Sequence, residues 1–397
     1  MKLWKKECAV LTMTFLLSAF AAGCSDAGND VPDKTAGQEG IVSFGLYIPG
    51  SGDQSGEDAY NENRFRTLDI FFYDMNTGDD EAALLHRHET LSDGQKILTV
   101  RLSADEMQQL GFPDRHNYFK AVAVANCSEV LALGKNETSI RSLRSVETRA
   151  EAGASVSFCS ASAPESFVMH TFDNPAIIAI HGDGESSETY KLHFKRLAAK
   201  IRVALAVTER VTDENGVSWL PDVGNMRLYI SNGVGASRLD GDMEHTGRAL
   251  GENDYYHIAT SASGETEDYA FARLLTRHDT NSLSGKKDET YLYYNDIPYY
   301  TYPNEWSGRE YPEAKPTMLV IAIPWESEDA GDSTTRMPAY YTMPVNNDGT
   351  IASDTYYYLR VRIGTMGSRQ YDAPAQTDAI YMKVSQWIID DNYVMLW

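Results

Sequence analysis

The sequence predicts an all-β protein made of two β-sandwich domains in tandem, with short helices in the loops. Many short runs of β-branched and aromatic residues alternate with turn signals rich in Gly, Pro, Asn and Asp. The 24 tyrosines, beside only 6 tryptophans, suit strands and polar-aromatic surfaces better than helix bundles. A chain of 397 residues, 42% of them hydrophobic, is long enough for two or three domains with real cores.

The N-terminus has the organisation of an export signal. A basic head is followed by a mostly apolar run, residues 9–22, which is shorter than the roughly 20 residues that a membrane-spanning helix needs. The run ends in Ala21-Ala22-Gly23-Cys24, which resembles the lipobox of bacterial lipoproteins, with Ala21 where that family usually has Leu. The resemblance implies that residues 1–23 are removed as a signal peptide and that Cys24 becomes the lipidated first residue. An ordinary cleaved signal is the alternative.

Charge and cysteine content narrow the class of protein further. The chain carries 57 acidic and 35 basic residues, a net charge of −22, which argues against a nucleic-acid partner and suits a soluble exposed surface. Apart from Cys24 and one cysteine inside the signal, only Cys127 and Cys159 remain. Spacing alone does not decide their pairing, so a disulfide and two separate thiols both stay open.

The region after Cys24 begins with a flexible linker, because residues 24–40 are polar and show no apolar periodicity. Short strands and helices are then expected in order. The predicted strands are 41–48, 68–73, 97–102, 118–126, 165–169 and 176–180, and the predicted helical turns are 103–107, 129–133 and 139–143. Ser103 is expected to be the N-cap of the first helical turn.

A basic and apolar stretch, residues 192–205, closes this region. From Lys200 onward basic and apolar residues alternate, as on a strand with one wet face. Arg196, Lys200 and Arg202 are therefore expected on a solvated strand face. A basic amphipathic helix competes, but the β-branched residues and the neighbouring strands favour a strand.

A second domain is expected after the turn signal Asp213-Glu214-Asn215-Gly216. Its predicted strands are 226–230, 317–323, 339–345 and 356–363, and residues 231–290 are expected to be mostly long loops. Residues 291–304 form the densest tyrosine cluster of the chain. The last segment, residues 379–397, is apolar up to the C-terminus, and such an end needs a partner sheet because chain ends fray unless they are tied down.

The order and spacing of these segments resemble the Bacteroidales fimbrillins, the FimA/Mfa-type pilus subunits. The resemblance is carried by the lipoprotein signal, the strand Leu68–Tyr73, the V-x-A-N strand ending at Asn126, and the R-x-x-A-K-I strand Arg196–Ile201. It implies two transthyretin-like, Greek-key sandwiches, here residues 41–209 and 210–397. It also implies an outer-membrane lipoprotein at the cell surface, a structural fimbrial subunit that mediates adhesion to host or bacterial surface glycans or proteins. Its partners would be copies of itself, accessory pilins and, through the lipid, the outer membrane.

In fimbrillins a protease removes the first strand and the C-terminal segment of the next subunit fills the groove that is left. Family members are cut after Arg or Lys in the loop that follows the first strand, but residues 50–63 contain neither, so Arg64 and Arg66 are the candidate processing sites. The candidate donor-strand residues are Ile380, Met382, Val384, Trp387, Ile389, Val394, Leu396 and Trp397. If no cleavage occurs, the chain is expected to be an anchor or terminator that donates a strand and accepts none.

No constellation for catalysis stands out in the sequence, so no enzyme, cofactor or metal is expected. His170, His181 and His193 lack the spacing of a zinc site, and the acidic run 240–245 lacks the spacing of an EF-hand. No nucleophile elbow or phosphate-binding glycine loop is present. The aromatic residues from Tyr291 to Trp306 could stack on sugar rings, which leaves a non-polymeric, glycan-binding surface lipoprotein as the alternative function.

Overall fold

Short β-strands carry the fold, as the sequence predicts. The computed structural model describes residues 39–48, 61–112, 118–133, 138–149, 166–180, 185–241, 255–256, 276–278, 290–294, 298–304, 315–327, 336–370 and 379–386. The strands up to residue 196 are Gly40–Tyr47 (β1), Thr67–Asp74 (β2), Leu85–Thr90 (β3), Ile97–Leu102 (β4), Tyr118–Ala125 (β5), Glu147–Arg149 (β6), Met169–His170 (β7), Ala176–Ala179 (β8), Glu185–His193 (β9) and Lys195–Arg196 (β10). The helices of this part are Ala104–Gln109 (α1), Ser128–Leu133 (α2) and Ile140–Arg144 (α3).

The strands after residue 196 follow the same pattern of short elements. They are Ala199–Thr208 (β11), Val211–Thr212 (β12), Ser218–Pro221 (β13), Arg227–Ser231 (β14), Gly233–Val234 (β15), Ala236–Arg238 (β16), Tyr255–Tyr256 (β17), Thr276–His278 (β18), Thr290–Tyr294 (β19), Tyr299–Thr301 (β20), Met318–Ser327 (β21), Arg336–Pro344 (β22), Thr355–Ile363 (β23) and Ala379–Gln386 (β24), with one 3₁₀ turn at Val223–Asn225 (η1). With strands this dominant, the all-β prediction is confirmed.

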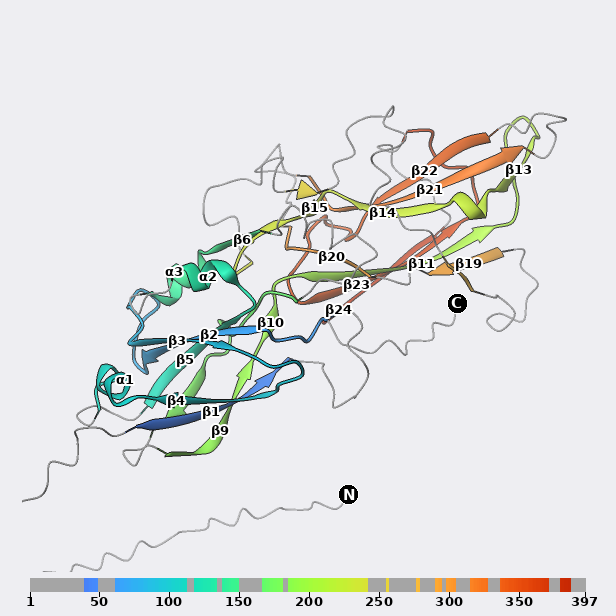
Figure 1. The fold of residues 1–397 in the computed structure, drawn as a ribbon. Helices are drawn as coiled ribbons and strands as arrows, with labels where there is room; N and C mark the ends of the chain where they lie inside the picture. The colour runs from blue at the N-terminus through green and yellow to red at the C-terminus, as the bar shows by residue number, and fades with distance from the viewer. Residues whose placement is uncertain are drawn as a thin grey trace, which may run out of the picture. The chain divides into compact units, whose positions relative to one another are not determined.

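The first sandwich consists of two sheets that share a core (Figure 1). One sheet has the order β4-β1-β9, and the other has the order β10-β7-β5-β2-β3, with β8 also paired to β5. Phe44 of β1 and Phe72 of β2 face each other across the core, with ring centroids 6.3 Å apart. The alternating burial along β1 matches this arrangement, because successive side chains of a strand point to opposite faces.

Helices cover the other face of β2. Phe71 and Tyr73 of β2 lie in one core with Val130 of α2 and Leu143 of α3. The short α1 begins where the sequence predicts, since Ser103 is its N-cap and forms a capping box with Glu106. Ser139 is the N-cap of α3, and its side chain accepts a hydrogen bond from the backbone N–H of Ser142.

The second sandwich packs a mixed sheet against an antiparallel one. The mixed sheet has the order β18-β19-β11-β23-β24, with β20 also on β11, and the antiparallel sheet has the order β12-β13-β21-β14, with β22 also on β21. Ile201 of β11 and Leu359 of β23 share a core with Ile321 of β21 and Tyr341 of β22. No helix among the described residues is long and apolar enough to cross a membrane.

The chain passes from one sandwich to the other between β10 and β11. β10 pairs with β7 of the first sandwich, whereas β11 runs parallel to β23 of the second. The expected strand Arg196–Ile201 is therefore divided between two sheets instead of closing the first domain. Gly37–Trp397 forms one compact unit, and a division at residue 209 remains a prediction.

Candidate functional site

The first strand, β1, is paired on both sides. It runs antiparallel to β4, with Val42 opposite Val100, and parallel to β9, with Leu46 opposite Leu192. Figure 1 shows β1 between these two strands. We call the space that β1 occupies between β4 and β9 the β1 slot.

One face of β1 is apolar and buried. Val42, Phe44 and Leu46 lie in the first core, as does Ile48, which follows the strand directly. Burying side chains of this size is worth about 1.5–3 kcal/mol each. Without β1, the slot would be an apolar trench between two strands that have unpaired N–H and C=O groups, and such edges readily accept another strand.

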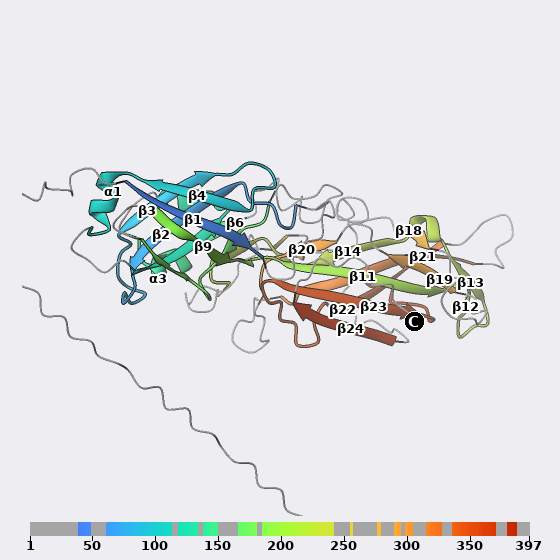
Figure 2. The same cartoon turned by 90° about the horizontal axis from the view of Figure 1, so that it is seen from below.

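The last described strand, β24, lies at the edge of its sheet (Figure 2). Three candidate donor residues belong to it, with Ile380 opposite Val361, Met382 opposite Leu359 and Val384 opposite Tyr357. Within the described part of the chain β24 pairs with β23 alone. The other candidate donor residues, Trp387, Ile389, Val394, Leu396 and Trp397, lie outside the described residues, as does Cys24.

Arg64 and Arg66, the candidate processing sites, lie in an ordered segment just before β2. The segment is held by Asn126, which follows β5 with a left-handed φ of 59°. The Asn126 side-chain amide donates to the Arg64 carbonyl at 2.8 Å, and its oxygen accepts from the Arg66 N–H at 2.7 Å. Phe65, between the two arginines, is buried and contacts Phe194 edge-on, with centroids 5.0 Å apart.

Immediately before this segment, Glu62 enters a buried ionic cluster. Its carboxylate lies 2.7 Å from the Lys200 ammonium and accepts a 2.6 Å hydrogen bond from the Tyr300 hydroxyl. All three side chains are buried. A buried cation requires such a partner, because a charge without one is very costly to bury.

Arg196 is the second cation of the cluster. Its guanidinium donates to Asp354 at 3.0 Å, to the Asn63 side-chain oxygen at 2.6 Å and to the Glu62 carbonyl at 2.9 Å. We refer to Glu62, Asn63, Arg196, Lys200, Tyr300 and Asp354 together as the junction. Arg196 is 0% exposed and Lys200 is 3% exposed. The prediction of a solvated face for these two residues is therefore wrong, because carboxylates from distant parts of the chain neutralise them.

Asp354 is held in place by its backbone as well as by its charge. It adopts a left-handed φ of 51°, and its N–H donates to the Ala198 carbonyl at 3.0 Å. Burial raises the pKa of the Asp354 carboxyl above its ordinary value, while the Arg196 guanidinium opposes that rise. The junction thus contains two cations and two carboxylates that balance one another.

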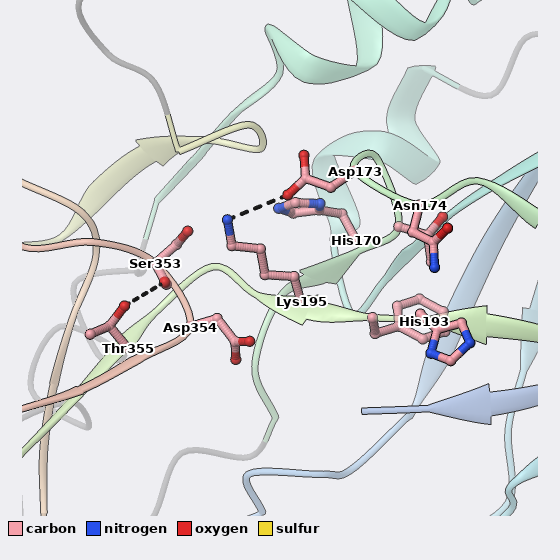
Figure 3. Close-up of a pocket in the computed structure, with 10 residues that line it drawn as sticks. His170, Asp173, Asn174, His193, Lys195, Ser353, Asp354 and Thr355 are labelled. Carbon is pink, nitrogen blue, oxygen red and sulfur yellow. Dashed lines mark hydrogen bonds and ion pairs between the residues drawn. The ribbon is translucent and has the colours of Figure 1, made fainter. Parts of the chain in front are cut away.

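A cleft of about 460 Å³ adjoins the junction (Figure 3). It is lined by residues that include His170, Asp173, His193, Lys195 and Asp354. The Lys195 ammonium lies 3.4 Å from Asp173, and both side chains are well exposed, so this ion pair adds little to stability. Burial lowers the pKa of His170 to about 3, which keeps its imidazole neutral.

The remaining candidate ligands do not assemble into a metal centre in the described part of the chain, where no three His, Cys, Asp or Glu residues are grouped to hold an ion. His181 and residues 242–245 of the acidic run lie outside the described residues. The Cys127 thiol is free and buried, and burial raises its pKa to about 12. Cys159 lies outside the described residues.

The described tyrosines of the 291–304 cluster with known side-chain positions are core residues. Tyr299, Tyr300 and Tyr302 are all buried, and the Tyr300 hydroxyl is bonded to Glu62. None of these three rings is available to stack on a sugar. This part of the cluster gives no support to a glycan-binding surface.

Comparison with known proteins identifies the fold. No family model and no curated protein matches the sequence. A solved fimbrilin (FimA) from Porphyromonas gingivalis superposes with a TM-score of 0.54 at 12% identity, covering 88% of this chain and 98% of that one.

Two further structures, both assigned to cell adhesion, give similar values. One, from Parabacteroides distasonis, has a TM-score of 0.52 at 13% identity and covers 88% of this chain and 100% of its own. The other, from Bacteroides eggerthii, has a TM-score of 0.51 at 15% identity and covers 91% of this chain and 98% of its own. The chain therefore has the all-β fold of the Bacteroidales fimbrillins along most of its length.

Proposed function

We propose that this chain is the lipoprotein precursor of a fimbrial subunit that assembles at the cell surface by strand exchange. The observation that carries the proposal is the place of β1, a strand with a buried apolar face that is paired on both sides. Export and lipidation at Cys24 come first. Cleavage after Arg64 or Arg66 then removes β1, and the C-terminal segment of another subunit fills the β1 slot. The chain works by assembly and adhesion, without catalysis.

The spacing of apolar residues in β1 and in the C-terminal segment supports this strand exchange. In β1 the buried residues Val42, Phe44 and Leu46 are spaced by two. Ile380, Met382 and Val384 repeat that spacing with apolar side chains of similar size. A strand with this period can place every second side chain in the apolar trench while its backbone satisfies the edges of β4 and β9.

A second role, that of an uncleaved anchor or terminator, is favoured by one specific observation. The loop after β1 has no basic residue between positions 49 and 60. The first two arginines beyond it are tied to Asn126 through their backbones. A chain that escapes cleavage keeps its lipid and its own β1, so it donates a strand and cannot accept one.

N-terminal sequencing with intact mass, on protein from outer membranes and from sheared surface material, tests the proposal. A start at Phe65 or Thr67 is expected for a polymerising subunit. An Arg64→Ala, Arg66→Ala double variant should then remain unprocessed, and unchanged processing would exclude these sites. A lipidated start at Cys24 in all material would instead point to the anchor role or to a non-polymeric surface lipoprotein.

A further inference from the structure

The segment that would be cut away contributes to the junction. Glu62 and Asn63 come directly before Arg64. The Glu62 carboxylate neutralises Lys200, and the Asn63 side-chain oxygen accepts a hydrogen bond from Arg196. Lys200 and Tyr300 belong to β11 and β20, two strands of the second sandwich. Residues 61–67 are therefore bound both to the second sandwich and, through Asn126 after β5, to the first sandwich.

Lys200, Tyr300 and Arg196 together bind the Glu62 residue that precedes the candidate cleavage sites. The Lys200 ammonium and the Tyr300 hydroxyl converge on the same oxygen of Glu62 at 2.7 Å and 2.6 Å. Lys200 also lies over the Tyr356 ring, 5.7 Å from its centroid. Arg196 adds a donor to the Glu62 carbonyl, so both the side chain and the backbone of this residue are bound.

Residues 64–67 follow without a break and are also bonded to the first sandwich. The Arg64 guanidinium lies 3.0 Å from Asp93, and the Arg66 carbonyl accepts from the Leu91 N–H at 2.8 Å. The Thr67 carbonyl accepts from the Asn126 N–H at 3.1 Å. A protease binds its substrate as an extended, unpaired backbone, so these hydrogen bonds must open before either arginine can enter an active site.

We infer that Arg196, Lys200 and Tyr300 form a carboxylate-binding site for the chain's own Glu62, and that this site controls proteolytic access to the bonds after Arg64 and Arg66. When Glu62 is bound, the segment 61–67 is closed and both bonds are protected. When Glu62 leaves, Lys200 and Arg196 lose bound partners together, so opening is costly and rare. The inference rests on the proposed processing at these arginines for its biological meaning.

The test is cleavage of the purified full-length chain in detergent by an arginine-specific endoprotease, followed by the appearance of N-termini at Phe65 and Thr67. If opening is fast relative to cleavage, the rate follows the population of the open segment. Glu62→Gln removes the carboxylate that lies 2.7 Å from the buried Lys200 ammonium and should raise the rate roughly a hundredfold or more. Glu214→Gln, at an exposed turn, is the matched control and should cleave like the unmodified chain.

A rate for Glu62→Gln equal to that of the control would overturn the inference. Because this variant could unfold altogether, hydrogen exchange of the unmodified protein supplies a second readout. The amides of Arg66 and Thr67, both bonded to the Asn126 oxygen, should exchange as slowly as the buried strand β5. Rapid exchange there would also overturn it. Neither readout depends on polymerisation, so the inference can fail while the proposed function stands, and the reverse.

Discussion

The two apolar strands nearest the ends of the described chain, β1 and β24, are held in opposite ways. β1 has hydrogen-bonded neighbours on both sides, β4 and β9, and three of its side chains lie in the first core, as does Ile48 just after the strand. In the described part of the chain β24 pairs with β23 alone, at the edge of its sheet. A strand held on both sides leaves only at large cost, whereas an edge strand can leave by breaking one ladder. The difference explains why the proposed strand exchange would need proteolysis to release β1 but none to release β24.

The largest effect is expected from truncating the centre of β1. Phe44→Ala removes a ring that is 0% exposed and contacts Phe72, so the free energy of unfolding should fall by about 3–5 kcal/mol. Chemical denaturation of the unprocessed chain measures it. Tyr118→Ala is the control, because the Tyr118 side chain is 56% exposed, and its effect should stay within about 0.5 kcal/mol. A similarly small effect for Phe44→Ala would mean that β1 is not held by its core face.

A smaller loss of folding free energy is expected from truncating the C-terminus. Deleting residues 380–397 removes most of β24 and the apolar tail, and among the described residues it breaks the pairing with β23 alone. Unfolding should remain cooperative, with a loss of stability below that of Phe44→Ala, and the folded monomer should no longer polymerise. Denaturation and gel analysis of surface material measure the two effects. Polymers formed by the truncated chain would contradict the donor-strand role.

The smallest change in the free energy of unfolding is expected on the solvent-exposed face of β4, beside β1. Thr99→Ala removes an exposed hydroxyl that is 3.1 Å from the Ser43 hydroxyl, opposite it on β1. The free energy of unfolding should change by no more than about 0.5 kcal/mol, because water replaces the lost partner. The same denaturation experiment measures this change. A loss comparable to that of Phe44→Ala would mean that the exposed face, and not the core face, holds β1.

Local sequence signals predicted much of the fold. The strand 97–102 matches β4, and the predicted strands 41–48 and 68–73 differ from β1 and β2 by about one residue at each end. The helix cap at Ser103 was also predictable, since a Ser followed three residues later by Glu is a local signal. In contrast, β9 begins Glu-Ser-Ser-Glu-Thr and has no alternating apolar pattern there, so its pairing with β1 could not be predicted.

The junction was not predictable for a different reason. The alternation of Lys200 and Arg202 with apolar residues is what a half-exposed strand would show, and Arg202 is half-buried. The burial of Arg196 and Lys200 depends on Asp354 and Glu62, which meet them only in three dimensions. Asn126 ends the V-x-A-N strand, one of the segments that carry the resemblance to fimbrillins. Its hydrogen bonds to Arg64, Arg66 and Thr67 join residues about 60 positions apart in the chain, so no local signal indicates them.

The mixed pairing of β1 has a consequence for the direction of any strand that replaces it. β1 is antiparallel to β4 and parallel to β9. A replacement that runs the opposite way would be parallel to β4 and antiparallel to β9, so the backbone would gain one ladder of each kind in either orientation. Hydrogen bonding alone therefore leaves the polarity of the incoming strand undetermined. That polarity, and with it the orientation of successive subunits, would have to be encoded by the fit of side chains to the trench beneath.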